Sequence, residues 1–402
     1  MLAFGSKRVL IFLGEEERVS IECFVEVVEF LDNRYFFIVI VCMGSIHKTF
    51  TEIVSPRHLF QCWDEFKRGK RGKEDVQRFE RYLEDNVFEL HDELASQRYR
   101  HGPYHTFHIY DPKHRVISKA SVRDRLVHHA LWRALSAVFE PTFIFHSYAS
   151  RLERGTHLAV VNVSHAMRSV SRNYTKQAYV LKCDIRKFFD SVDHQKLLAL
   201  IERKISDSQL LWLLRDVVSS FSAKPSSTLS LSLSLSLSLN SDNFLDTGLP
   251  IGNLTSQIFA NIYLNELDQF VKHTLHIHDY FRYADDFVIV HSDSNYLQDT
   301  LAAIRSFLPE TLALELHPRK VEIRKFSQGI DFLGYVILPY YAVLRTKTRR
   351  RMFKKLFEAD AQIRTGRLTE ASFGQMVQSY LGLLKHCSGY NTSQVIRNSF
   401  HI

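Results

Sequence analysis

Three aspartates have the residue type and spacing that metal-dependent chemistry requires. Asp184 directly follows the apolar segment 179–183. Asp285 and Asp286 lie side by side within the largely apolar segment 280–290. Both segments have the length and composition of β-strands, with the Asp pair at a hairpin tip. Adjacent carboxylates repel each other. A solvated turn is one explanation of such a pair, and a divalent cation that neutralises it is the other.

The second explanation corresponds to a defined chemistry. Phosphoryl transfer from a nucleoside triphosphate depends mainly on positioning and charge stabilisation. Two divalent ions about 3.5–4 Å apart supply both, one at the attacking oxygen and one at the triphosphate. Mg²⁺ prefers hard oxygen ligands, and Mn²⁺ is an alternative. On this explanation Asp184 and Asp285 would be ligands of a two-Mg²⁺ site for nucleotidyl transfer, with Asp286 beside them, and the three aspartates alone leave the solvated turn open as well.

Composition narrows the class of protein. The chain has 402 residues, of which 45% are hydrophobic, with a formal net charge of +8. A basic folded chain favours polyanionic partners, nucleic acid before anionic membrane. The five cysteines are scattered without a C-x-x-C pair, which argues against a zinc module or disulfide framework and fits a reducing compartment. No apolar run reaches the roughly 18–20 residues of a membrane span, and the acidic residues 15–17 argue against a signal peptide. We expect a cytoplasmic protein with no membrane partner.

The surrounding segments predict an α+β fold. In several of them apolar residues recur every three or four positions, the pattern of amphipathic helices. One such pattern, over residues 79–94, predicts a single long helix. Helices are predicted within 55–98, 123–139, 194–205 and 256–275, and strands over 104–110, 115–118, 179–184 and 280–290. Strands interleaved with helices favour a palm-like core whose sheet carries the aspartates.

Two segments fall outside this pattern. Residues 21–41 are rich in Val, Ile and Phe but interrupted by acidic residues. They predict a hairpin, a helix or an upstream extension, with translation starting at Met43. Residues 229–239 alternate Leu and Ser strictly, which fits a half-buried strand but also a translated dinucleotide repeat. We interpret residues 222–246 as a low-complexity loop insertion.

Five ordered sequence blocks indicate a family. They resemble, motif after motif, the palm of reverse transcriptases, and the resemblance covers roughly residues 55–386. The blocks are residues 182–192 (KCDIRKFFDSV), 248–257 (GLPIGNLTSQ), 282–286 (RYADD), 316–320 (LHPRK) and 332–335 (FLGY). The resemblance implies a right-hand polymerase of the α+β class, with fingers, a palm built on an antiparallel sheet with helices, and a small helical thumb. It also implies RNA-directed DNA polymerase activity.

The same resemblance implies domain boundaries. Residues 1–45 form an N-terminal extension of unknown role, 46–178 the fingers and the start of the palm, 179–340 the palm with the insertion at 222–246, and 341–402 the thumb.

Residue roles near the nucleotide follow from the resemblance. Asp184 and Asp285 correspond to the metal-binding aspartates, and Asp286 to their acidic neighbour. Lys320 corresponds to the catalytic lysine near the leaving pyrophosphate. Phe189 corresponds to the aromatic gate that crowds a ribose 2′-hydroxyl and so selects deoxynucleotides. The remaining nucleotide-binding positions are Ile185, Phe188, Ile251, Gly252, Ser256, Gln257, Arg115 and Arg123, with Lys113 and Arg125 as competitors for the last two.

Two further segments correspond to elements that hold nucleic acid. The primer grip, the hairpin that holds the primer 3′ end, comprises Phe332, Leu333, Gly334 and Tyr335. Residues 345–355 include seven basic residues in eleven and occupy the place of the thumb. Contacts of Lys and Arg with a nucleic-acid backbone are sequence-independent and salt-sensitive. The expected template–primer contacts are Arg345, Lys347, Arg349, Arg350 and Lys354.

The block at 248–257 points to a subgroup. Many reverse transcriptases have Gln at the position of Ile251 and Pro at the position of Gln257. The block instead resembles that of diversity-generating retroelements, within the group II intron-like bacterial lineage. Members copy a template RNA into cDNA from deoxynucleoside triphosphates, with errors at adenines. They work with a small basic accessory variability determinant protein.

Two alternatives remain open at the level of the sequence. The chain fits another bacterial reverse transcriptase, either group II intron-like or defence-associated. A non-catalytic RNA-binding scaffold is the other alternative, which the intact Asp184, Asp285 and Asp286 disfavour.

Overall fold

The computed structural model describes residues 49–111, 113–223 and 246–400, together with the backbone of three short strands nearer the N-terminus. These strands, β1 (Ser6–Val9), β2 (Cys23–Glu26) and β3 (Ile40–Val41), pair in an antiparallel manner. Apart from them, the predictions for residues 1–45, and nearly all of the 222–246 insertion, lie outside the described residues. The chain divides into two compact units. Unit 1 comprises residues 1–105, 120–142 and 202–216, and unit 2 comprises residues 106–119, 143–201 and 217–402.

Within its described residues, unit 1 is mainly helical. Its helices are α1 (Phe50–Ile53), α2 (Pro56–Phe66), α3 (Glu74–Glu80), α4 (Leu83–Ala95), α5 (Val122–Phe139), the 3₁₀ turn η1 (Glu140–Thr142) and most of α9 (Ser208–Ser219). The predicted single helix over 79–94 is wrong. It is interrupted before α4 because Tyr82 has a non-helical backbone, with φ −125° and ψ 45°. The apolar faces of α2, α4 and α5 bury Trp63, Leu90 and Leu131 completely or nearly so.

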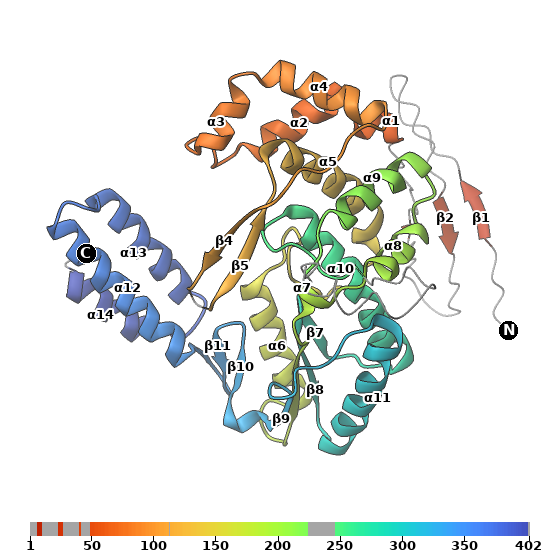
Figure 1. Cartoon of the computed structure of the whole chain (residues 1–402). Coiled ribbons are helices and arrows are strands. Elements are labelled where there is room, and N and C mark those ends of the chain that lie inside the picture. The colour runs from red at the N-terminus through yellow and green to blue at the C-terminus, as the bar shows by residue number, and fades with distance from the viewer. Residues whose placement is uncertain are drawn as a thin grey trace, which may run out of the picture. The chain divides into compact units, whose positions relative to one another are not determined.

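Unit 2 is built on a four-stranded antiparallel sheet with strand order β7-β8-β6-β9 (Figure 1). The strands are β6 (Tyr179–Asp184), β7 (Tyr280–Tyr283), β8 (Asp286–His291) and β9 (Glu322–Lys325). Side chains alternate between the two faces of a strand. One face packs against α6 (Thr156–Val170), and the other against α10 (Leu254–Gln269) and α11 (Ser294–Leu312). The predicted α+β class is confirmed.

Shorter elements connect the sheet to its surroundings. β4 (His105–Ile109) and β5 (Arg115–Lys119) pair as a two-stranded ribbon. Two helices, α7 (Phe188–Ser191) and α8 (His194–Glu202), follow β6. The predicted helix over 256–275 is α10 extended by the π-helical turn η3 (Phe270–Thr274). Among the described residues, no helix combines the length and the apolar character that a membrane span needs.

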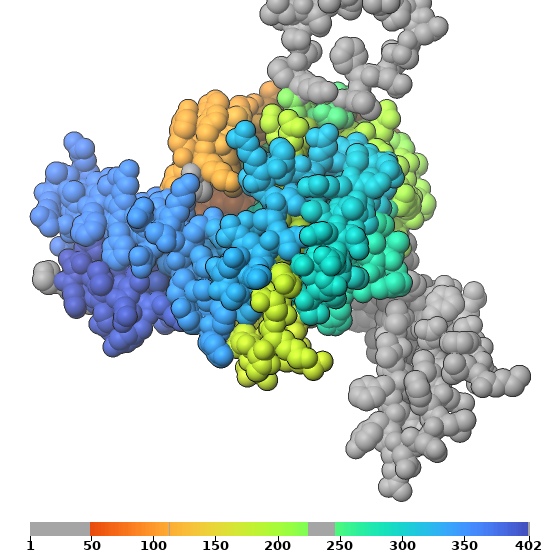
Figure 2. All heavy atoms as spheres, turned by 90° about the horizontal axis from the view of Figure 1, so that it is seen from below, coloured from red at the N-terminus to blue at the C-terminus, as the bar shows by residue number. Residues whose placement is uncertain are grey.

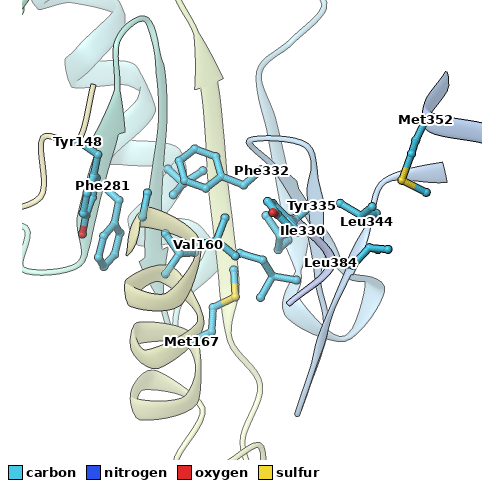
Figure 3. Packing of buried hydrophobic residues seen from close by; sticks show 14 of the residues in the cluster. Tyr148, Val160, Met167, Phe281, Ile330, Phe332, Tyr335, Leu344, Met352 and Leu384 are labelled. Atoms are coloured by element: carbon cyan, nitrogen blue, oxygen red, sulfur yellow. The ribbon is translucent and has the colours of Figure 1, made fainter. Parts of the chain in front are cut away.

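The C-terminal part of unit 2 joins the sheet through one hydrophobic core. β10 (Ile330–Phe332), β11 (Tyr335–Ile337) and β12 (Ala342–Leu344) form a small antiparallel sheet preceded by η4 (Phe326–Gln328). The helices α12 (Thr346–Arg364), α13 (Glu370–Leu384) and α14 (Tyr390–Phe400) pack against one another at the blue end of the chain (Figure 2). Figure 3 shows side chains of α6, this small sheet and these helices meeting in the shared core.

Candidate active site

Strand register brings the three predicted aspartates together at one end of the sheet. Asp184 is the last residue of β6, and its antiparallel partner on β8 is Asp286. Directly opposed residues on paired strands place their side chains on the same face. The Ile185 backbone N–H donates to the Asp285 carbonyl oxygen across 3.1 Å, so Asp285 lies at the same edge. The predicted hairpin tip is therefore present, with Asp184 beside it.

A buried ion pair holds the turn that carries Asp285. The turn joins β7 to β8 through Ala284, whose φ of +52° is in the left-handed region, a conformation that L-residues adopt at a cost. Arg282 donates to the Ala284 carbonyl across 3.3 Å and forms a fully buried ion pair with Asp268 at 2.6 Å. The Arg282 backbone also exchanges hydrogen bonds with the segment containing His146. Arg282 thus connects the turn to α10 and to its neighbouring segment.

The carboxylates at this edge are electrostatically unfavourable as they stand. Burial, followed by the negative charges of Asp285 and Asp184, raises the pKa of Asp286 to about 6. Burial is also the largest cause of the raised pKa of Asp285, which the Asp184 charge raises further. The positive charges of Lys320 and Lys113 oppose that second shift. The folded chain therefore concentrates negative charge that nearby lysines offset only in part.

Lys320 contacts the first aspartate directly. Its Nζ atom lies 2.8 Å from Oδ1 and 2.7 Å from Oδ2 of Asp184. The backbone places it there, because the His317 N–H donates to the Asp184 carbonyl at 2.8 Å and the Lys320 N–H donates to the His317 carbonyl at 3.1 Å. The lysine that the resemblance assigned to catalysis thus lies at the predicted metal-binding edge.

The donor chemistry of this edge fits a hard divalent cation. All three side chains offer carboxylate oxygens, and a dication between them would relieve the repulsion that raises the pKa of Asp286. Among residues 49–111, 113–223 and 246–400, no group of three or more His, Cys, Asp or Glu side chains is arranged to hold a metal ion as it stands. Mg²⁺ is usually held by only one or two carboxylates together with substrate phosphates. Asp184 and Asp285 would be the protein ligands.

Helix α7 begins four residues after Asp184, the last residue of β6. Phe188 is buried and Phe189, the predicted gate, is half-buried, with ring centroids 5.3 Å apart. The Phe189 carbonyl accepts a hydrogen bond from the Leu249 N–H at 2.6 Å. The predicted gate is therefore tied to the segment that contains Ile251.

Ile251 and Gly252 pack against β5 by backbone contacts. The Ser118 N–H donates to the Ile251 carbonyl at 2.9 Å, and Asn253 Nδ2 donates to the Ser118 carbonyl at 2.7 Å. Gly252 has φ +120°, and a Cβ atom there would lie 2.8 Å from Ile117. Only glycine meets both conditions without displacement. The other predicted positions of this region differ in exposure: Ile185 and Ser256 are buried, and Gln257 is exposed.

The basic residues predicted to contact the triphosphate separate into two groups. Arg115 and Lys113 are exposed residues of unit 2, and the Lys113 charge lowers the pKa of Asp285. Arg123 belongs to unit 1, where it forms ion pairs with Glu93 and Asp124. Arg125 is also in unit 1 and pairs with Asp75 at 2.5 Å. The charge of Lys113 therefore acts on Asp285 at the acidic edge.

The predicted primer grip presents mainly its turn. Phe332 and Tyr335 are 1% and 2% exposed, and both belong to the hydrophobic core (Figure 3). Leu333 and Gly334 form the two-residue turn between β10 and β11, with φ values of +49° and +90°. Positive φ at both positions is the signature of a type I′ turn. The two aromatic residues position the hairpin, and the turn residues are partly exposed.

Basic residues of α12 differ in their partners. Arg345 pairs with Asp331, and Lys354 pairs with Glu358 at 3.7 Å. Arg351 and Lys355, which sequence reasoning did not single out, both pair with Asp111 beyond the end of β4. The basic cluster at 345–355 was the sequence signal that could have drawn attention to these two residues. The sequence does not show which members of the cluster face a carboxylate, because that depends on helix phase and tertiary contacts. Lys347, Arg349 and Arg350 are exposed and have no ion pair within the described part of the chain.

An acidic edge on an antiparallel sheet, flanked by a lysine and by helices, defines the palm of a template-directed nucleotidyl transferase. Residues 110–337, more than half of the chain, match the family model described as reverse transcriptase (RNA-dependent DNA polymerase). The chain belongs to this reverse transcriptase family.

Individual relatives and a solved structure are similar to parts of this chain. Protein YkfC of Escherichia coli is 27% identical over 62% of this chain and 70% of that protein. The group II intron-encoded protein LtrA of Lactococcus lactis is 23% identical over 64% of this chain, which spans half of that protein. The chain covers half or less of each intron-encoded relative. A solved structure of telomerase from Candida albicans is 14% identical over 79% of this chain and 60% of that chain, with a TM-score of 0.43.

Proposed function

We propose that this chain is an active RNA-directed DNA polymerase of the diversity-generating retroelement type, which copies a template RNA into cDNA. The observation that carries the proposal is the convergence of Asp184, Asp285 and Asp286 at one sheet edge, where burial raises the pKa values of Asp285 and Asp286. Membership of the reverse transcriptase family supports the same activity. The domain boundaries given under Sequence analysis, with fingers, palm and thumb, belong to this proposal.

The residues of the acidic edge would divide the work of nucleotide addition. Two Mg²⁺ ions, when bound, supply charge stabilisation at the attacking 3′-oxygen and the triphosphate. Asp184 and Asp285 would hold these ions, and Asp286 would add a further negative charge beside them. The Lys320 ammonium, which contacts Asp184, would supply positive charge beside the leaving pyrophosphate. Lys113 lies within electrostatic range of the same edge and neutralises the triphosphate.

The subgroup rests on the sequence block around Ile251. Its carbonyl is occupied by the Ser118 N–H, so only an apolar side chain remains to contact a nucleotide. A Gln side chain at the same position would offer hydrogen bonds that help to fix the pose of the nucleotide. Loss of a polar constraint reduces discrimination between correct and incorrect substrates. This supports low fidelity in general, whereas the bias toward adenine rests on the family resemblance alone.

Primer extension on an RNA template with Mg²⁺ tests the activity. The wild-type chain should extend a DNA primer, and Asp285→Asn should not, while its melting temperature stays at or above that of wild type. Extension by Asp285→Asn at a rate within about tenfold of wild type would contradict the metal assignment.

Sequencing of the cDNA tests the subgroup. An RNA with all four bases in matched contexts should give most errors opposite adenine, and Ile251→Gln should narrow that bias. Equal error rates at the four bases would remove the retroelement assignment and leave a group II intron-like or defence-associated reverse transcriptase. If the bias toward adenine is unchanged in Ile251→Gln, only the role proposed for Ile251 is contradicted.

Sugar selection provides a third test. Phe189→Ala removes the half-buried ring that would crowd a 2′-hydroxyl, so incorporation of ribonucleotides should rise relative to deoxynucleotides. An unchanged ratio would place the gate elsewhere.

A further inference from the structure

The helices α12 and α14 enclose a groove on unit 2 that the proposed polymerase chemistry does not use. It has a volume of about 500 Å³ and is lined by Arg349, Arg350, Phe353, Asn391, Thr392 and Val395. Sites that hold ligands typically measure roughly 300–1,000 Å³. The lining combines two guanidinium groups, one aromatic ring, an amide and a hydroxyl, and it contains no acidic side chain.

The groove lies on a different flank of α12 from the residues that face β4. Met352, Leu356 and Ala359 form the buried face of the helix. Arg351 and Lys355 lie on one side of that face and pair with Asp111.

Phe353 lies on the other side. It follows Arg351 by two positions, about 200° around an α-helix. A nucleic-acid strand held between α12 and the β4–β5 ribbon would therefore contact a different flank of α12 from the groove.

Positive charge without a carboxylate partner is concentrated at the groove. Arg345, Arg351, Lys354, Lys355 and Arg364 of the α12 region each pair with an acidic residue. Arg349 and Arg350 have no such partner within the described part of the chain, and of the exposed basic residues of α12 only Lys347, outside the groove lining, shares this property there. Unpaired arginines attract a polyanion without first giving up an ion pair.

Exposed aromatic rings lie beside this charge. Phe353 lines the groove, and Tyr390, next to the lining residue Asn391, is 74% exposed. Phe357, one turn beyond Phe353 on α12, is 56% exposed. Guanidinium groups interleaved with aromatic rings are the combination that binds single-stranded nucleic acid, by phosphate contacts and base stacking. An acidic peptide would use the charge but would leave the exposed rings without stacking partners.

We propose that the α12–α14 groove binds single-stranded RNA outside the catalytic cleft, as an anchoring site for an unpaired segment of the template RNA. The identity of the strand as template RNA rests on the proposed function. The resemblance implies that Arg349 and Arg350 contact the template–primer duplex. On this proposal they contact a second strand instead.

Binding of a labelled oligouridylate to the full chain tests the proposal, with the cleft saturated by a primer–template hairpin. Arg349→Gln/Arg350→Gln should weaken binding at least about tenfold and reduce the salt slope by about 1.4, since each lost phosphate contact on a single strand contributes roughly 0.7. Tyr390→Ala should weaken binding about tenfold without changing the slope, because stacking carries no charge. Arg367→Gln/Arg397→Gln removes the same charge from exposed positions outside the groove and should stay within about twofold of wild type.

Three outcomes would overturn the proposal. The first is unchanged binding in Arg349→Gln/Arg350→Gln, and the second is an equal loss in Arg367→Gln/Arg397→Gln. The third is polyglutamate binding as tightly as oligouridylate with the same sensitivity to the variants, which would assign the groove to an acidic protein. Extension of the hairpin is measured in parallel. Its absence in wild type would contradict the polymerase proposal, while the oligouridylate measurements would still decide the groove.

Discussion

Two charged clusters share the β7–β8 hairpin, one through Arg282 and the other through Asp285 and Asp286, and their charges are balanced to different degrees. Asp268 and Arg282 are completely buried and mutually paired, and Tyr280 and Ser147 complete their hydrogen bonds. The cluster of Asp184, Asp285 and Asp286 is crowded, and Lys320 is its direct ion-pair partner.

The comparison separates structural charge from functional charge. A buried pair whose hydrogen bonds are all made stabilises one geometry of the turn. An excess of negative charge destabilises the folded chain until a cation binds it. The acidic edge therefore has a role that folding alone does not explain, and four substitutions test the distinction.

The largest expected effect is on catalysis at the acidic edge. Asp184→Asn removes a metal ligand and should reduce the rate of primer extension by at least about a thousandfold, equivalent to ~4 kcal/mol. The melting temperature should not fall, and the rise in melting temperature that Mg²⁺ causes in wild type should be lost. A rate of primer extension within about tenfold of wild type would show that the Asp184 charge serves the structure rather than catalysis.

Breaking the buried pair should affect stability most. Arg282→Met leaves the Asp268 carboxylate buried without its partner and should lower the free energy of unfolding by about 3–5 kcal/mol. Urea unfolding measures this change. The double variant Asp268→Leu/Arg282→Met removes both charges and should recover part of the loss. Wild-type stability in Arg282→Met would mean that the pair does not hold the Ala284 turn.

Asp286→Asn should stabilise the chain. Its folded-state pKa of about 6 lies above the ordinary value of 3.8. The folded chain therefore binds more protons than the unfolded chain between about pH 4 and 6, and the free energy of unfolding should decrease as pH rises through this window. Removing the charge should raise the free energy of unfolding by up to about 3 kcal/mol at pH 7, at roughly 1.4 kcal/mol for each unit of the pKa difference, and flatten the profile. A lower melting temperature at pH 7 without metal would contradict this account.

The smallest expected effect is at the partly exposed ion pair. The Lys320 side chain is 42% exposed, and such pairs contribute about 0–1 kcal/mol. Lys320→Met should therefore change the free energy of unfolding by at most ~1 kcal/mol, in contrast to Arg282→Met. A loss of more than about 3 kcal/mol would indicate that Lys320 serves structure rather than catalysis.

The positions of the aspartates could be predicted from sequence because Asp184 ends one apolar strand and Asp286 begins another, with Asp285 in the turn directly before it. Strand length and the acidic tip were enough to predict the β7–β8 hairpin. The pair of Asp268 and Arg282 was not predicted, although a charged residue within each apolar element was a usable signal. Which charges meet depends on which face of α10 lies on the sheet, and apolar periodicity alone does not give that choice.

Two other features were not predicted from the sequence, for similar reasons. They are the burial of the aromatic rings of the predicted primer grip and the ion-pair partners of the basic residues of α12. Phe332 and Tyr335 were identified as part of a motif. In the structure they flank a two-residue type I′ turn, and both rings are buried in the core. The pairing of Asp111 with Lys355 joins residues far apart in the sequence. Such contacts depend on tertiary packing, which local patterns do not encode.

The strand order of the main sheet has a consequence for synthesis of the chain. β6 is a central strand, but its partners β8 and β9 follow it by about a hundred residues or more. At translation rates of about 5–20 residues per second, roughly 5–20 s pass between the synthesis of β6 and the synthesis of the first strand that pairs with it. During that time its apolar edges are exposed to other nascent chains, and Asp184 has no acidic partner opposite it. Because the segment 222–246 lies within this interval, shortening it would reduce the delay, with little effect on the stability of the finished fold.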